Sequence, residues 1–208
     1  MDSTKEPAQR MRRAQRREQI LAAATRAFAR GGFAATSLDD IAAETGVTRV
    51  ILYRHFESKT DLYRAVLDRF CSVLADLVRE TVGEFTNAAV AGLVGAATAE
   101  PDGFRLLFQH AAREPEFRAW ARQFQQGMTE AAHQQIAAVV ADPTWARWAS
   151  QLAPVVAVEA IIAWLDAGQP DPEHAADRIG HAIDAVITAA ARSTVDGRPS
   201  PKSRRRPS

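Results

Sequence analysis

Apolar residues recur at intervals of three or four positions along most of this chain. Near the N-terminus Ile20, Ala24 and Phe28 follow one another at four-residue steps, and similar intervals return between residues 62 and 77. Such spacing places side chains on one face of an α-helix, whereas a β-strand requires alternation. An alanine-rich composition with only 7% aromatic residues agrees with helices throughout. The pattern predicts an all-α protein of about nine helices.

The chain has 208 residues, enough for a sizeable core in one domain or two small ones. Its single cysteine, Cys71, allows no internal disulfide and fits a reducing compartment. The N-terminus is too polar for a secretory signal. The longest apolar run, residues 152–165, contains Pro154 and Glu159 and is shorter than a membrane span of roughly 20 residues. These features predict a cytoplasmic protein that is not attached to a membrane.

Charge is distributed unevenly along the chain. Residues 1–60 hold 11 Lys and Arg against 7 Asp and Glu, and residues 193–208 hold 5 against 1, so each end has an excess of four positive charges. Residues 61–192 hold 10 against 17. A basic head on an acidic body is typical of a nucleic-acid-binding domain joined to a domain with another task. Alternatively, the charged ends only keep the chain soluble.

Composition divides the chain into four segments. Residues 1–14 are polar, basic and aperiodic, and are predicted to be a disordered arm. Residues 15–60 form the head and residues 61–192 the body, joined by a long helix without a flexible linker. Residues 193–208 are a Ser-, Pro- and Arg-rich tail that is predicted to be disordered. The arginines at the N-terminus either enter a minor groove of DNA or remain a screened tail; they are Arg10, Arg12, Arg13, Arg16 and Arg17.

The head contains the end signals of three helices. A pair of glycines at positions 31 and 32 ends the first helix. The pair Thr36-Ser37 supplies the N-cap of a second helix, and Gly46 ends it after about two turns. Thr48 is expected to cap a third helix that extends to His55. Two short helices around a glycine turn, after a supporting helix, predict a helix-turn-helix unit.

The third helix lies within the stretch GVTRVILYRHF and carries side chains suited to DNA recognition. Residues 50–53 favour a strand by propensity, but no neighbouring segment alternates to pair with it, so a helix with Leu52 inward is predicted. In the major groove Arg49 could bind guanine, while Val50 and Ile51 could contact thymine methyl groups. Three other side chains could donate hydrogen bonds to phosphates, namely those of Tyr53, His55 and Lys59. Alternatively, these are ordinary packing residues and solvated charges.

The run TSLDDIAAETGVTRVILYRHFESKTDL resembles the DNA-binding domain of TetR-type (TetR/AcrR) transcriptional regulators, and the resemblance covers about residues 16–67. Its most specific part is the motif GV…LYxHFxSKxxL, which begins at Gly46. The resemblance implies a homodimer of nine-helix subunits that binds a palindromic operator in double-stranded DNA, most often as a repressor. The predicted DNA-contacting residues are Thr36, Thr48, Arg49, Val50, Ile51, Tyr53, His55 and Lys59.

This chain departs from the family at two of these positions. Members usually have a small residue and then Thr or Ser where this chain has Val50-Ile51. Two bulky apolar groups in place of polar ones favour contacts with thymine methyl groups.

The resemblance also implies that the middle helices of the body enclose a pocket for a small-molecule effector. An aromatic-rich segment supplies the predicted ligand-binding residues, which are Phe104, Phe108, His110, Trp120, Phe124 and Gln125. A largely apolar pocket with a few polar groups would suit an apolar or amphipathic ligand. Alternatively, an aromatic stripe at helical spacing is ordinary core.

The last two helices form the dimer interface in the family that the chain resembles. Their apolar faces supply the predicted interface residues Val155, Val158, Ile162, Leu165, Ile179, Ile183 and Ile187. Pairing with a second copy would form a four-helix bundle. The alternative is a monomeric two-helix core, which would leave the recognition helices unpaired.

The sequence contains no Gly-rich phosphate loop, nucleophile elbow or plausible catalytic triad. Asp177, His181 and Asp184 share a helix face, but the chain has no paired cysteines or facing histidines to complete a metal site. We therefore expect no catalytic residue, metal or cofactor. The sequence predicts a ligand-released TetR-like repressor. The alternative is a helical small-molecule-binding protein that does not act through DNA.

Overall fold

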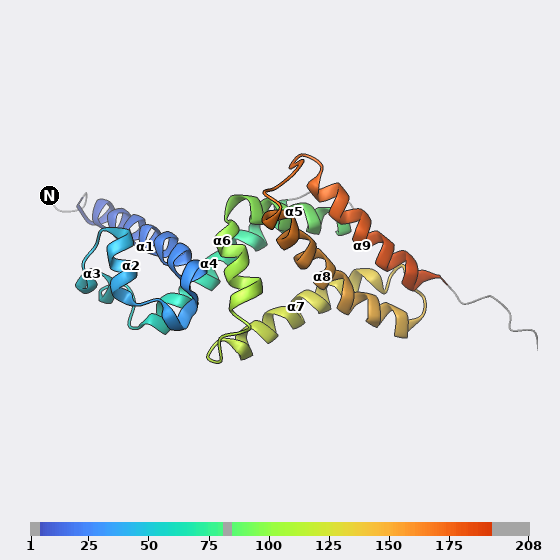
Figure 1. Cartoon of the computed structure of the whole chain (residues 1–208), viewed down its shortest axis with the longest axis horizontal. Helices are drawn as coiled ribbons and strands as arrows, with labels where there is room; N and C mark the ends of the chain where they lie inside the picture. The colour runs from blue at the N-terminus through green and yellow to red at the C-terminus, as the bar shows by residue number, and fades with distance from the viewer. Residues whose placement is uncertain (1–4, 81–84, 193–208) are drawn as a thin grey trace, which may run out of the picture.

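The computed structural model describes residues 5–80 and 85–192. Every regular element in these ranges is a helix, which confirms the predicted all-α fold (Figure 1). The head is built from α1 (Lys5–Ala35), α2 (Leu38–Thr45) and α3 (Arg49–Tyr53), and α4 (Lys59–Glu80) follows. The body adds α5 (Phe85–Ala99), α6 (Pro101–Arg105), the π-helical turn η1 (Leu106–His110), α7 (Arg118–Ile136), α8 (Pro143–Asp166) and α9 (Ala175–Ala191).

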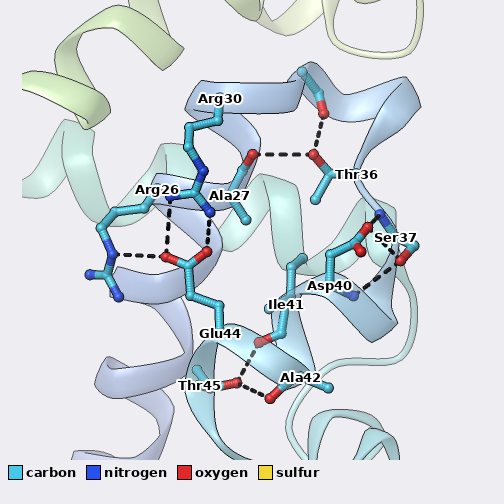
Figure 2. A network of polar contacts seen from close by, with 11 residues as sticks. Arg26, Ala27, Arg30, Thr36, Ser37, Asp40, Ile41, Ala42, Glu44 and Thr45 are labelled. Atoms are coloured by element: carbon cyan, nitrogen blue, oxygen red, sulfur yellow. Dashed lines mark hydrogen bonds and ion pairs between the residues drawn. The ribbon is translucent and has the colours of Figure 1, made fainter.

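The break in α1 and both ends of α2 lie where the sequence predicts. α1 breaks at Gly32, whose φ of 71° lies in the left-handed region. Ser37 caps α2, because its hydroxyl accepts the N–H of Asp40 while the Asp40 carboxylate accepts the N–H of Ser37 (Figure 2). Gly46 ends α2 with a φ of 67°. These caps are confirmed, and they define the turn between α2 and α3.

The prediction of a disordered arm over residues 1–14 is wrong from Lys5 onward, because α1 begins there. Residues 5–19 are rich in Arg, Gln, Ala and Glu, which favour helix, and contain no glycine. Pro7 lies in the first turn, where an N–H has no helical acceptor. Once the apolar stripe of α1 is anchored in the core, each added residue extends an existing helix without a new nucleation step. The predicted tail, residues 193–208, lies outside the described residues.

α4 is continuous from the head into the body (Figure 1). Aromatic rings pack where the two parts meet: the ring centroid of Tyr63 on α4 lies 4.9 Å from that of Phe28 and 4.4 Å from that of Phe117. Phe33 contacts Phe117 in the same cluster, at 5.3 Å. The carboxylate of Glu114 accepts the backbone N–H of Phe33 at 3.0 Å. The body therefore holds the head through α1 as well as through α4.

Two helices of the body begin with a proline, whose missing N–H costs nothing in the first turn of a helix. Pro101 and Pro143 lie at the start of α6 and α8. α7 and α9 begin three residues after Pro115 and Pro172. Before α7, the buried side chain of Phe117 belongs to the aromatic cluster, and this contact holds the preceding residues in turns.

Among the described residues, α8 alone is long and apolar enough to cross a membrane. Half of its most apolar window is buried inside the protein, and the helix packs against both α7 and α9. The core helix of a folded domain has the same composition. The apolar character of α8 is therefore explained by packing within the subunit.

Candidate nucleic-acid interface and ligand cavity

α3 presents three exposed side chains at the opposite end of the molecule from α9 (Figure 1). The exposed fraction is 61% for Val50, 49% for Tyr53 and 54% for the side chain of Arg49. Leu52 faces inward and is 1% exposed, as predicted. The α-helix covers only Arg49–Tyr53, because the chain turns at His55 toward the start of α4.

Arg49 is held on the outer face of α3 by weak contacts. Its guanidinium donates to a carboxylate oxygen of Asp39 at 3.1 Å and to the hydroxyl of Tyr53 at 3.3 Å. Both partners are exposed, and an exposed ion pair contributes at most about 1 kcal/mol. The edge of a base pair can therefore replace Asp39 at little cost.

Two other residues of this segment differ from expectation. Thr48 stands at the N-cap position of α3, but its hydroxyl makes no capping hydrogen bond, so the predicted side-chain cap is wrong. Thr48 is exposed, and its hydroxyl remains available. Ile51 is half-buried and packs against the core. Val50 is therefore the more accessible of the two predicted thymine contacts.

Two predicted DNA-contacting residues, one buried and one half-buried, donate to backbone carbonyl groups within the head. Thr36 is 5% exposed, and its hydroxyl donates to the carbonyl oxygen of Gly32 at 2.7 Å (Figure 2). The ammonium group of Lys59 donates to the carbonyl oxygens of Phe33 at 2.8 Å and Thr36 at 3.1 Å. The turn between α1 and α2 leaves these carbonyl groups without helical donors. Both side chains therefore use their donors within the head, and their contact with DNA stays a prediction.

His55 lies between α3 and the N-terminal turns of α1. Its side chain is half-buried, and burial is the main cause that lowers the pKa of its imidazole. Arg13, Arg17 and Arg16 on α1 lower this pKa further through their positive charges. The guanidinium carbon of Arg17 also lies 5.1 Å from the ring centroid of Phe56. Sequence reasoning identified these arginines but not their place beside α3, because it did not predict that α1 starts so early.

The body contains a cavity of about 570 Å³ between α4, α5, α7, α8 and α9. Its lining includes Leu74, Val90, Met128, Gln135, Ala157 and Ile187. Among the residues that the structure describes, Gln135 is the one polar side chain of the lining, and none of them is charged. Val139 on the rim is 64% exposed, so the cavity opens to solvent.

None of the six predicted ligand-binding residues lines this cavity. Phe104 is fully buried with its ring 4.5 Å from that of Phe108, and the rings of Trp120 and Phe124 stack at 5.8 Å. Phe104 belongs to the core and the other three rings are half-buried against it, which agrees with the alternative interpretation. The remaining two also lie elsewhere: Gln125 is exposed, and His110 is a half-buried residue whose pKa is lowered by burial.

The sequence signal that was missed was the set of alanines at positions 131, 132, 138, 153 and 157, because small side chains on facing helices leave space.

The predicted dimer-interface residues differ in their exposure within one subunit, and their place in a dimer stays a prediction. Ile162, Leu165, Ile179 and Ile183 are buried within one subunit, where α8 packs against α9. Val158 and Ile187 are half-buried, and Val155 is 55% exposed. Two tryptophans on α8, Trp145 and Trp148, are also exposed, at 44% and 40%. The accessible apolar surface of α8 therefore follows Trp148 and Val155, which are seven residues apart on one face.

The described ranges contain no group of three His, Cys, Asp or Glu side chains placed to hold a metal ion. The histidine nearest the face of Asp177 and His181 is His174, whose ring lies 2.7 Å from a carboxylate oxygen of Asp171. That carboxylate also accepts from Arg178 at 2.8 Å. These residues form surface ion pairs.

A helix-turn-helix head, a continuous connecting helix and a helical body with an apolar cavity define the class of helical DNA-binding regulators. Residues 20–66 match the family described as bacterial regulatory proteins, tetR family. The chain is 34% identical over 129 residues to the HTH-type transcriptional activator FasR of Mycolicibacterium smegmatis, an alignment that covers 59% of each protein. The chain thus spans less than two thirds of that relative.

Two solved structures share the fold. A TetR-like transcriptional regulator from Rhodococcus sp. RHA1 gives a TM-score of 0.71 at 20% identity, over 83% of this chain and 96% of that one. AibR, solved with isovaleryl coenzyme A and operator DNA, gives a TM-score of 0.63 at 18% identity, over 80% and 97%. Residues 20–66 of this chain therefore match the tetR family of bacterial regulatory proteins, and the chain shares the fold of TetR-like regulators.

Proposed function

We propose that this protein is a cytoplasmic transcriptional repressor that binds a palindromic DNA operator as a homodimer. The observation that carries the proposal is the exposure of Arg49, Val50 and Tyr53 on a helix anchored by buried Leu52. The major groove is wide enough for such a helix. There Arg49 donates two hydrogen bonds to guanine and Val50 contacts a thymine methyl group. Tyr53, Thr48 and His55 donate to phosphates.

Dimerisation follows from the geometry of the duplex. One α3 contacts one half-site, and a second copy related by a two-fold axis supplies another α3 about 34 Å away, one turn of DNA further on. The exposed Trp148 and Val155 on α8 support the proposal, because aromatic side chains are enriched at protein interfaces. These residues replace the buried isoleucines of the predicted interface.

The cavity supports a proposal that an effector controls DNA binding. The lining residues that the structure describes have no charged side chain, so the enclosed part of the ligand is uncharged and apolar. Leu74 of the lining belongs to α4, and the same helix carries the head. A ligand that favours one position of α4 changes the separation of the two recognition helices and releases the operator. The structure of AibR contains both isovaleryl coenzyme A and operator DNA, which agrees with one protein that binds a small molecule as well as an operator.

The DNA-binding proposal is tested by selecting duplexes from a random pool with the full chain at a stated salt concentration. We expect a palindromic sequence with half-sites one helical turn apart. Arg49→Ala removes the bidentate contact and should weaken binding by about 1–3 kcal/mol, with relaxed preference at one guanine. Arg122→Ala is the matched control, because it also removes one positive charge, from an exposed arginine of the body. Enrichment of no sequence would favour the alternative of a small-molecule-binding protein that does not act through DNA.

The effector proposal is tested with a neutral fluorescent naphthylamine dye. We expect it to bind the full chain and to be displaced by decanol more readily than by decanoate, since the described lining residues offer no positive charge. Ala157→Phe fills the cavity and should abolish dye binding, whereas Ala119→Phe, at an exposed position of α7, should not. Operator affinity is then measured with and without decanol. An equal affinity despite displacement of the dye would contradict release by ligand.

The direction of regulation is tested with a reporter gene cloned downstream of the selected operator. A repressor lowers expression when the chain is present. The relative FasR is named an activator. A rise in expression would show that this chain is also an activator.

A further inference from the structure

The N-terminal part of α1 whose side chains the structure describes is exposed. Residues 13–19 are all exposed, and Ile20 is the first buried residue after them. In sequence, residues 5–19 hold six Lys and Arg against two Asp and Glu. A helical segment that is polar on every side is not held in place by a core. Its length and charge therefore suggest a partner outside the subunit.

Two contacts fix the orientation of this segment. The guanidinium carbon of Arg17 lies 5.1 Å from the ring centroid of Phe56, in the turn that follows α3. The carboxylate of Glu18 accepts from the guanidinium of Arg69 on α4 at 2.8 Å. Arg13 precedes Arg17 by one helical turn and lies on the same side. The exposed arginines therefore stand next to the C-terminal end of the recognition helix, and Figure 1 shows the start of α1 at the same end of the molecule as α3.

We propose that the N-terminal turns of α1 form a second DNA-binding element, in which Arg13, Arg16 and Arg17 bind phosphates next to the base pairs contacted by α3. The inference rests on the proposed function, because it assumes that α3 occupies the major groove. Charge complementarity identifies the partner as the phosphodiester backbone of that same duplex.

The helical state of this segment decides how it meets DNA. An α-helix with its side chains is about 10–12 Å across, whereas the minor groove is about 6 Å wide. The helix cannot enter that groove as an extended arm would. It crosses the sugar–phosphate backbone instead, so its contacts strengthen binding without adding base specificity.

The experiment compares Arg13→Gln/Arg16→Gln/Arg17→Gln with a matched variant, Arg118→Gln/Arg122→Gln/Arg147→Gln. Both variants lose three positive charges at exposed positions, but the second set lies on α7 and α8. Affinity for the duplex selected by the unmodified chain is measured over a range of salt concentrations. Each lost phosphate contact should reduce the slope of log K against log salt by about 0.9. We expect a slope reduced by up to about 2.7 per subunit and binding at least about tenfold weaker near physiological salt.

Three further results complete the test. The control variant should keep the slope, and the α1 variant should select the same sequence as the unmodified chain. An unchanged slope in the α1 variant, an equal loss in the control, or altered base preference would each overturn the inference while leaving the proposed function intact. If the unmodified chain selects no sequence, the proposed function itself fails and the inference fails with it.

Discussion

The ammonium group of Lys59, the first residue of α4, lies 2.8 Å from the carbonyl oxygen of Phe33 and 4.4 Å from the centroid of its ring. The same group donates to the carbonyl oxygen of Thr36. One side chain thus ties the start of α4 to the turn that joins α1 to α2. Lys59 therefore connects α4 directly to the helix-turn-helix unit that carries α3, and stabilises that unit.

Lys59→Met tests this role, because it keeps the length of the side chain and removes its donors. The variant leaves the carbonyl groups of Phe33 and Thr36 without their donor. We expect the free energy of unfolding to fall by about 1–3 kcal/mol, measured by urea denaturation. The operator affinity of the folded variant should stay essentially unchanged. Normal stability with weaker DNA binding would show that Lys59 serves a phosphate instead.

Gly103 allows α6 to approach α4 closely. A Cβ at this position would lie 2.6 Å from Cδ2 of Phe70, whose side chain is buried. Gly103→Ala should therefore destabilise the protein by about 1–3 kcal/mol, because a packed core does not accept added volume. Thermal and urea denaturation measure the change.

A matched substitution separates this clash from the ordinary effect of alanine in a helix. Gly95 lies inside α5 with no atom within 4 Å of the added Cβ. Gly95→Ala should stabilise the protein by about 0.5–1 kcal/mol, because alanine favours helix. Combining Gly103→Ala with Phe70→Leu should cost less than the sum of the two single changes. Strict additivity would argue against the close contact.

The pKa of His55 predicts opposite effects of acid on folding and on DNA binding. Burial and the arginines of α1 lower this pKa below the value of about 6.5 that the unfolded chain has. The resulting stability is fully present above about pH 6.5 and is lost as pH falls through the pKa of the folded state. Urea denaturation at several pH values measures the loss, and His55→Gln should remove this part of it.

DNA binding is expected to have the opposite pH dependence. A phosphate near His55 raises the pKa of the imidazole in the complex, so binding takes up a proton. We expect operator affinity to rise as pH falls through the pKa of the complex, at constant ionic strength, and to level off below the pKa of the free protein. The His55→Gln variant should lack this dependence. The same pH dependence in that variant would place the titrating group elsewhere.

Val50 and Ile51 should respond differently to the same substitution. Val50 is exposed, so Val50→Thr should change stability by no more than about 0.5 kcal/mol while altering preference at one base position. Ile51 packs against the core, so Ile51→Thr should cost about 1 kcal/mol of stability. Selection from a random pool and urea denaturation distinguish the two effects. A base preference altered only by the change at Ile51 would reverse this assignment.

Sequence patterns were sufficient for the local features of the head. Ser37 and Gly46 begin and end α2 through contacts with residues a few positions away, so short segments of sequence specify them. The exposure of Arg49 and Tyr53 followed from the same kind of argument. Once Leu52 is assigned to the inner face of α3, the helical repeat turns both residues outward.

Contacts between distant segments could not be predicted in this way. Thr36 and Lys59 have polar groups suited to phosphates, but in the folded chain they serve backbone carbonyl groups at the end of α1. Nothing in the sequence around Lys59 indicates that Phe33 will lie beside it. Donors that are exposed in an isolated helix become occupied once a turn from another helix packs against them.

The sequence by itself determined that the chain is helical, where α1 breaks and α2 begins and ends, and which face of α3 remains exposed. Tertiary structure alone decided that α1 places Arg13 and Arg17 beside His55, that α8 and α9 bury Ile162 and Ile183 against each other, and that an apolar cavity remains in the body. The reason is physical. Apolar spacing shows that one face of a helix is buried but not which surface covers it, and a cavity is the volume left over when five helices pack.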